Sequence, residues 1–393
     1  MTVHNPSPSQ RGTSSTRALI VASIALFTDN LVVGLAVPVL PLLPSVVDAG
    51  PTWTGILFAS YAVAVVVSAL VAGRFVDRYG PKAPLLIGMV GLAAATLLFA
   101  TGGPYWLLLL ARTAQGISGG MSWVAALSLI AATTTFEKRG QQMGIAISMI
   151  TVGVLIGPPL AGVMVEHFGT ASPFLFAAAV ALIDGLLRII LIKDSPRVAD
   201  DTSGPFAVLR VPGSVSIVVA IVIGAAVMAG VEPVLPVHLN ASALTIGLLF
   251  GLAALTGVIA NPIVGGLVAS VSSRILIGLG IVAVVASLLT VGYSTELWQT
   301  AIGMGLLGLS AALLHAPATT LISEQGFKAQ PPTLGGSFSL YTLAYAVGLA
   351  GGPLLTGFAV EHAGFTTAMV VSAVILAALG AVSLRRLPDQ HLR

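Results

Sequence analysis

The sequence contains no cysteine, and only 8% of its 393 residues are charged. The absence of cysteine excludes disulfide bonds and thiol chemistry, although it leaves the cellular compartment open. The scarcity of charge excludes an ordinary soluble protein, in which about a quarter of the residues are charged. Long polar stretches are scarce as well. The two longest are residues 1–17 and 194–212, and neither is long enough for a soluble domain.

Apolar residues fill most of the chain instead. They make up 56% of it and give a mean hydropathy of +1.02. This composition predicts an all-α polytopic membrane protein surrounded by membrane lipids. The formal net charge of +3 does not indicate a nucleic-acid partner, because the basic residues lie mainly in loops that flank the apolar runs.

Apolar runs separated by short polar breaks predict twelve membrane-spanning helices. A bilayer core about 30 Å thick requires about 20 helical residues, and most runs reach that length. Glycine and proline inside these runs are tolerated in membrane helices. The predicted spans are residues 18–43, 53–72, 84–101, 105–134, 142–165, 172–193, 214–237, 243–269, 274–293, 297–323, 334–360 and 365–386.

The basic residues predict how the spans are oriented. With twelve spans, every Lys and Arg except Arg112 falls on one side, and the opposite loops carry none. The positive-inside rule therefore places both termini in the cytoplasm. The first span is longer than a signal-peptide core and contains an acid, so we expect it to be retained. The predicted parts are a cytoplasmic N-terminal tail (1–17), a six-helix bundle (18–193), a cytoplasmic linker (194–213), a second six-helix bundle (214–387) and a cytoplasmic C-terminal tail (388–393).

Two motifs recur at one fixed offset. The tetrapeptide Pro-Val-Leu-Pro at 38–41 returns at 233–236, and the glycine-rich run 153–162 matches 348–357. Both offsets are 195 residues. The repeat predicts two pseudo-repeats of six spans each, in parallel orientation.

Two of the acids inside apolar spans are each close to one copy of the tetrapeptide. Asp29 is near the middle of the first span, and Glu232 directly precedes the second copy. A carboxylate at the centre of a membrane helix costs about 2.5–3.5 kcal/mol on insertion scales, so each acid is expected to face protein or water and to have a function. Because burial disfavours the charged form, such a group is suited to take up and release a proton.

The segment 73–82, Gly-Arg-Phe-Val-Asp-Arg-Tyr-Gly-Pro-Lys, resembles the signature loop between the second and third spans of the major facilitator superfamily. Its acid is suited to cap a helix N-terminus, and its basic residues are suited to form ion pairs at a cytoplasmic gate. The alternative is a basic turn with no specific function. The residues assigned to gating are Gly73, Asp77, Arg78, Gly80 and Lys82.

Two further motifs resemble the same superfamily. Residues 112–116, Arg-Thr-Ala-Gln-Gly, resemble its fourth-span motif. Arg112 is interpreted as the only basic residue within a span, and it is expected to meet an acid because an unpaired buried Arg is costly. The run 153–162 resembles the fifth-span signature of the antiporter branch, whose glycines permit close helix contact. The alternatives are a purely structural pair and ordinary helix packing. The assigned antiporter-motif residues are Gly153, Gly157, Pro158 and Gly162.

Together with 172–175 and 183–185, these motifs resemble the vesicular amine transporters and their bacterial drug:proton antiporter relatives. The resemblance implies that Asp29 is associated with the amine and that Arg112 and Glu232 form a polar pair. The neighbouring Asn30 and Gln115 join them as candidate substrate-binding or proton-coupling residues.

The chain departs from the vesicular transporters at three positions. Tyr61, Ala312 and Thr342 stand where that family has a Lys and two Asp residues. In that family the Lys at the position of Tyr61 and the Asp at the position of Thr342 are partners, so the loss of both leaves no orphan charge and fits a relative with a reduced proton network. The loop between the first two spans is also short, so a bacterial exporter in the cytoplasmic membrane is favoured over a vesicular protein.

Several remaining residues have a functional and a structural interpretation. Tyr341 and Tyr345 lie four residues apart on one helix face, next to the second glycine-rich run, and are candidates for cation–π contacts with a substrate. Asp184 and Arg188 are interpreted as a local pair. His315 is interpreted as a packing residue. Three other aromatic residues are each interpreted as core residues: Tyr61, Trp123 and Phe338.

The sequence shows no metal-ligand cluster, nucleotide-binding loop or nucleophilic triad, so we expect no enzyme, cofactor or metal. The preferred hypothesis is a monomeric secondary active exporter, driven by the proton gradient, that moves cationic or lipophilic amine-like molecules or drugs by alternating access. Two alternatives stay open. One is a proton-coupled transporter of a neutral or anionic metabolite, with Arg112 as the substrate anchor, and the other is a non-transporting receptor or scaffold.

Overall fold

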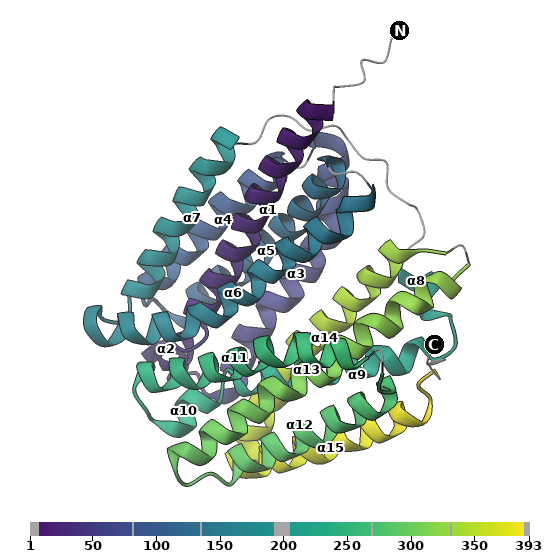
Figure 1. The fold of residues 1–393 in the computed structure, drawn as a ribbon. Helices are drawn as coiled ribbons and strands as arrows, with labels where there is room; N and C mark the ends of the chain where they lie inside the picture. The colour runs from purple at the N-terminus through teal and green to yellow at the C-terminus, as the bar shows by residue number, and fades with distance from the viewer. Residues whose placement is uncertain are drawn as a thin grey trace. The chain divides into compact units, whose positions relative to one another are not determined.

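A computed structural model describes residues 8–80, 82–133, 136–191, 205–268, 270–330 and 332–388. Within these residues every regular element is a helix (Figure 1). The helices are α1 (Pro8–Ala36), η1 (Leu40–Leu42), α2 (Pro44–Val47), α3 (Pro51–Tyr79), α4 (Lys82–Ala100), α5 (Tyr105–Thr133), α6 (Phe136–Phe168), α7 (Ser172–Leu191), α8 (Pro205–Leu209), α9 (Ser214–Val231), α10 (Leu235–Leu239), α11 (Ala243–Leu267), α12 (Ser273–Gly292), α13 (Leu297–Lys328), α14 (Leu334–Ala363) and α15 (Phe365–Arg385).

The predicted spans correspond to these long helices. Eleven helical segments in the described part of the chain are long and apolar enough to cross a membrane. The twelfth predicted span corresponds to α5, which has 29 residues and carries Arg112 and Gln115. The prediction of an all-α polytopic membrane protein with twelve long helices is confirmed.

Local sequence signals explain where several helices begin. The Ser242 hydroxyl caps α11 by accepting a hydrogen bond from Thr245 N, at 3.2 Å. The Thr333 hydroxyl caps α14 in the same way, accepting from Gly336 N at 2.8 Å. Such caps satisfy backbone N–H groups that have no partner within the helix.

Two predicted spans are not continuous helices. Helix α1 ends at Ala36 and is followed by a turn and the short η1, while α9 ends at Val231 and is followed by a turn and α10. Both breaks fall at the Pro-Val-Leu-Pro tetrapeptide, since proline lacks the N–H that would continue a helix. Val39 (φ −102°, ψ −43°) and Val234 (φ −106°, ψ −31°) have nearly the same backbone conformation. The two copies of the motif therefore fold alike.

The chain forms two compact units. One contains residues 1–36 and 64–200, and the other contains residues 37–63 and 201–393. The predicted bundle boundaries stay a prediction, and residues 194–204 of the predicted linker lie outside the described residues. The described end of the linker includes α8, which packs against α13 and α14.

The same close packing occurs in each unit. In the first, α1 packs against α6, and a Cβ on Gly153 would lie 2.7 Å from Phe27 O and 2.8 Å from Leu31 N. In the second, α9 packs against α14, and a Cβ on Gly348 would lie 2.6 Å from Val222 O and 2.9 Å from Ala226 N.

Each partner in the second unit is 195 residues beyond its partner in the first. The repeat read from the sequence therefore extends to individual backbone atoms, and the pseudo-repeat prediction is confirmed.

Candidate functional site

Asp29 lies in α1 with only 6% of its surface exposed. Its Oδ1 atom is buried and has no hydrogen-bond partner among the described residues. Three polar side chains of the same unit act on the carboxylate: Ser122 of α5 and the pair Asp184 and Arg188 of α7. The Ser122 hydroxyl is itself buried without hydrogen-bond geometry to a partner. A buried carboxylate with an open acceptor atom is suited to receive a proton or a cation.

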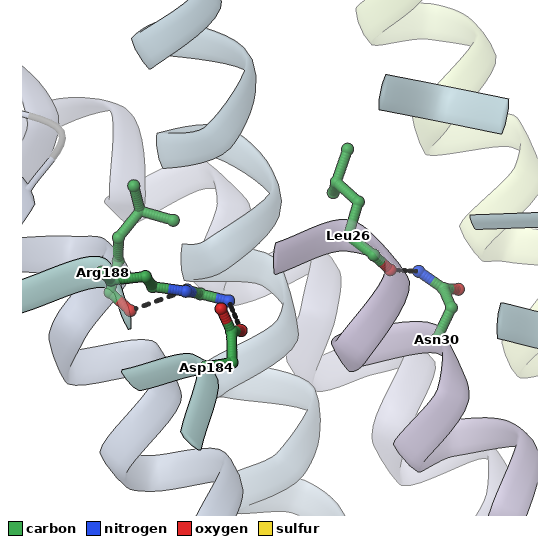
Figure 2. A network of polar contacts seen from close by, with 5 residues as sticks. Leu26, Asn30, Asp184 and Arg188 are labelled. Carbon is green, nitrogen blue, oxygen red and sulfur yellow. Dashed lines mark hydrogen bonds and ion pairs between the residues drawn. The ribbon is translucent and has the colours of Figure 1, made fainter. Parts of the chain in front are cut away.

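Asp184 and Arg188 form a buried ion pair, as Figure 2 shows. Arg188 Nη2 lies 2.5 Å from Asp184 Oδ2, and Arg188 Nη1 donates to Leu85 O of α4 at 3.0 Å. The side chains are 0% and 3% exposed. The predicted local pair is confirmed. The expectation that Arg112 is the only basic residue within a span is wrong, because Arg188 lies inside α7. The guanidinium is thus bonded both to its own helix and to α4, which connects α7 to α4.

Arg112 and Gln115 lie one turn apart in α5 and are 2% and 0% exposed. Arg112 Nη1 donates a hydrogen bond to Gln115 Oε1 at 2.5 Å. The amide therefore orients the guanidinium within the first unit. The pairing of Arg112 with Glu232 would join residues of different units and stays a prediction.

Asn30 is half-buried, and its amide is engaged within its own helix. Asn30 Nδ2 donates to Leu26 O at 2.8 Å (Figure 2). Since Leu26 is one turn earlier, this bond holds the side chain against α1. The contact of Asn30 with a substrate stays a prediction.

The antiporter-motif residues lie in α6, at its contact with α1. A Cβ on Gly157 would lie 2.7 Å from Gly34 Cα, so the two helix backbones touch where neither residue has a side chain. Pro158 and Gly162 are buried in the same helix. This arrangement agrees with the close-packing role that the glycines suggested.

The predicted gating loop is described only in part. Helix α3 runs through Gly73, Asp77 and Arg78, but the surroundings of Gly73 and the side chains of Asp77 and Arg78 lie outside what the structure describes. Gly80 has φ +74° and its N–H donates to Val76 O at 2.7 Å, which closes the C-terminus of α3. Lys82 begins α4. A left-handed glycine at this point ends the helix at little cost, and the ion-pair role of the loop stays a prediction.

In the second unit, Glu232 is the C-cap of α9, with helical backbone angles of φ −53° and ψ −48°. Its side chain is half-buried and acts electrostatically on Tyr345 of α14. The break at the second Pro-Val-Leu-Pro copy follows immediately, so the acid sits where α9 stops.

Tyr341 and Tyr345 form one aromatic cluster with His315 of α13. The Tyr341 and Tyr345 rings are stacked with centroids 6.3 Å apart, and Tyr341 Oη lies 3.1 Å from His315 Nδ1. The Tyr–Tyr proximity was predicted from their spacing. The participation of His315 was not, because it depends on how α13 packs against α14.

The other candidate aromatic residues differ in their burial. Trp123 packs against an apolar core of the first unit, which agrees with its interpretation as a core residue. Phe338 is 51% exposed, so its interpretation as a core residue is wrong, and Tyr61 is half-buried. Among the described residues, no group of three or more His, Asp or Glu side chains is placed to hold a metal ion.

Comparison with known proteins identifies a family whose model matches most of this chain. A family model described as the Major Facilitator Superfamily matches residues 22–238 and 214–392. The chromaffin granule amine transporter of Rattus norvegicus is 33% identical over 335 residues, which cover 82% of this chain and 63% of that protein. The synaptic vesicular amine transporter of Homo sapiens is 26% identical, with 82% of this chain and 64% of that protein covered. The chain thus spans less than two thirds of the length of these relatives.

A solved structure shares the fold. It is a bacterial homolog of the human lysosomal transporter Spinster in an inward-facing, unoccupied conformation, with a TM-score of 0.75 and 15% identity. The alignment covers 97% of this chain and 98% of that chain. At this identity the likeness establishes the architecture alone.

Proposed function

Because the chain belongs to the Major Facilitator Superfamily, as its motifs indicated, we propose that it is a proton-coupled antiporter. In this proposal it exports cationic or lipophilic amine-like small molecules across a bacterial cytoplasmic membrane. The relation to the amine transporters supports an amine-like substrate. The positive-inside pattern supports cytoplasmic termini, and we propose a monomer as the working unit.

The observation that carries the proposal is the state of Asp29. Its carboxylate is buried in a membrane helix, and Oδ1 has no hydrogen-bond partner among the described residues. The adjacent Arg188 is already engaged by Asp184 and Leu85 O, so it does not close a direct pair with Asp29 in the described structure. The carboxylate therefore has an acceptor atom left for an exchangeable partner.

Exchange at such a group follows from electrostatics. A desolvated carboxylate is costly when it is charged and alone, but either a proton or an organic cation neutralises it. Both cannot occupy the same oxygen at once, so cation binding releases the proton. Alternating access then converts this competition into antiport, since each face of the membrane offers the site a different proton concentration. Glu232 is the second proposed exchanging acid, in the other unit.

Proton release tests the proposal directly. Tetraphenylphosphonium or a primary aromatic amine is added to purified protein in weakly buffered detergent solution, and the released protons are counted with a pH indicator. We expect release from wild type, loss or reduction in Asp29→Asn and Glu232→Gln, and normal release from Asp48→Asn, which removes an exposed acid just after α2. Absence of release from folded wild-type protein with every cation tested refutes cation/proton antiport.

A second candidate function rests on Arg112. This buried guanidinium is held by the amide of Gln115, an arrangement that also suits a carboxylate-bearing or neutral polar substrate. In that case the transported molecule is a neutral or anionic metabolite, and Arg112→Lys weakens its binding while cations do not compete. Flux measurements in proteoliposomes with both classes of substrate separate the two candidates.

A further inference from the structure

The cluster of His315, Tyr341 and Tyr345 contains an ionisable side chain that the proposed exchange does not use. His315 lies near the middle of α13, and both tyrosines lie on α14. The His315 ring centroid is 5.3 Å from that of Tyr345 and 6.0 Å from that of Tyr341. Tyr341 Oη and His315 Nδ1 share a hydrogen bond of 3.1 Å. The three rings thus form a compact aromatic group, in which the imidazole of His315 is the group that can become positively charged.

A glycine of α9, Gly224, packs against the imidazole ring of His315. A Cβ on Gly224 would lie 2.7 Å from His315 Nε2 and 3.0 Å from Cε1, so any larger residue would displace the imidazole. The ring is therefore held between the backbone of α9 and the hydroxyl of Tyr341. Thr319, one turn later on α13, bonds its hydroxyl to His315 O at 2.7 Å.

The pseudo-repeat relates Gly224, the glycine packed against His315, to Asp29 of the first unit. Gly224 is 195 residues beyond Asp29 and is its equivalent in the second unit. His315 Nε2 approaches the point where the side chain of that equivalent residue would begin. An ionisable group thus occupies, in the second unit, the place that the first unit gives to its buried carboxylate.

Few other charges reach the cluster from the helices packed against α13. Helices α8, α9 and α11 contain no titratable residue, and Glu232, just past the end of α9, acts on Tyr345. Arg274 at the start of α12 donates to Leu387 O at 2.9 Å. The remaining titratable groups lie toward the ends of α13 and α14: Glu296, Glu324, Lys328, Glu361 and His362.

We propose that Tyr341, Tyr345 and His315 form a binding site for organic ammonium ions, in which protonation of His315 expels the cation. This rests on the proposed antiport function and adds a proton-responsive residue to it. Tyr345 is 38% exposed, so part of its side chain is open to a ligand. Aromatic faces attract ammonium groups through their negative quadrupole. A neutral imidazole leaves this attraction intact, whereas an imidazolium adds a positive charge and makes both ring nitrogens donors.

The expected effect is large enough to measure. Two unit charges about 5 Å apart, at the effective dielectric constant of about 20 that suits protein sites, weaken binding on the order of 100-fold. Binding of the cation should therefore fall as pH decreases through the titration of His315, beyond any loss due to Asp29 or Glu232.

The test measures tetraphenylphosphonium affinity of the full-length protein in nanodiscs from pH 4 to pH 8. We expect wild type to lose about twofold more affinity than His315→Gln between pH 8 and pH 4. The control His362→Gln, which changes an exposed histidine at the end of α14, should follow wild type. Tyr345→Leu should weaken binding at every pH, and Tyr345→Phe, which retains an aromatic face, should weaken it less.

Tyr341→Phe is the second variant should His315→Gln fail to fold. It removes the hydroxyl that bonds Nδ1 but keeps the ring, so the midpoint of the pH profile should shift relative to wild type. Superimposable pH profiles of wild type and either folded variant overturn the role of His315 alone. Absence of cation binding to wild type at every pH overturns the proposed function together with this site.

Discussion

Replacing one glycine of α14 by alanine should destabilise the protein, while replacing its neighbour three residues on should not. A Cβ on Gly348 would lie 2.6 Å from both Val222 O and Ala225 Cβ, and 2.9 Å from Ala226 N. A Cβ on Gly351 would meet nothing within 4 Å. Overpacking of this kind costs about 1–3 kcal/mol, because α9 must move away from α14. Alanine in a helix gains up to about 1 kcal/mol over glycine, which offsets only part of this cost.

Thermal unfolding of the purified variants in detergent measures the difference. A change of 1 kcal/mol moves the melting temperature by about 2–4 °C in a domain of 150–250 residues, so Gly348→Ala should melt several degrees below Gly351→Ala. Gly153→Ala should behave like Gly348→Ala, since its Cβ would lie 2.7 Å from Phe27 O. Equal melting temperatures for Gly348→Ala and Gly351→Ala would refute the reasoning from close backbone contact.

Three further outcomes are expected. Asp29→Asn should abolish export of cationic substrates with the melting temperature retained, and proton-driven export by that variant in proteoliposomes would contradict the role of this acid. Arg188→Met should lower the free energy of unfolding by about 3–5 kcal/mol, because it leaves the buried Asp184 without its partner. The double variant Asp184→Leu/Arg188→Met should recover most of the lost stability, as thermal unfolding would show. Thr333→Ala should cost about 1 kcal/mol by removing the cap of α14, while Thr333→Ser should remain near wild type in the same assay.

The sequence was sufficient for the features that depend on local pattern. Apolar run length located the long helices, and the offset of 195 residues predicted a pseudo-repeat that holds for contacts such as Gly153 with Phe27 O and Gly348 with Val222 O. The proline motifs were recognised as repeats, yet their effect on the helices was not. Both spans break there, although the chemistry of proline contained that information.

The contacts around the candidate residues depend on tertiary packing and were not predictable from spacing. Arg188 is four residues from Asp184, which indicated a pair, but only the packing of α7 against α1 and α4 shows that the pair is buried and acts on Asp29. His315 is a lone histidine in an apolar run. Its hydrogen bond with Tyr341 forms only because α13 packs against α14. Its imidazole fits only because the residue that faces it on α9, 91 positions earlier in the chain, is a glycine.

The matching glycine contacts also indicate how the chain evolved. Independent origins would have to place a glycine against the corresponding backbone atoms of a partner helix in each unit, at one offset, which chance rarely achieves. The simpler account is that an ancestral half-length chain already had the α1–α6 contact before its gene was duplicated. Positions 29 and 224 diverged afterwards, one toward a carboxylate and the other toward no side chain. Deep mutational scanning should therefore give similar tolerance at 153 and 348 and dissimilar tolerance at 29 and 224, which separates the inherited framework from the chemistry acquired later.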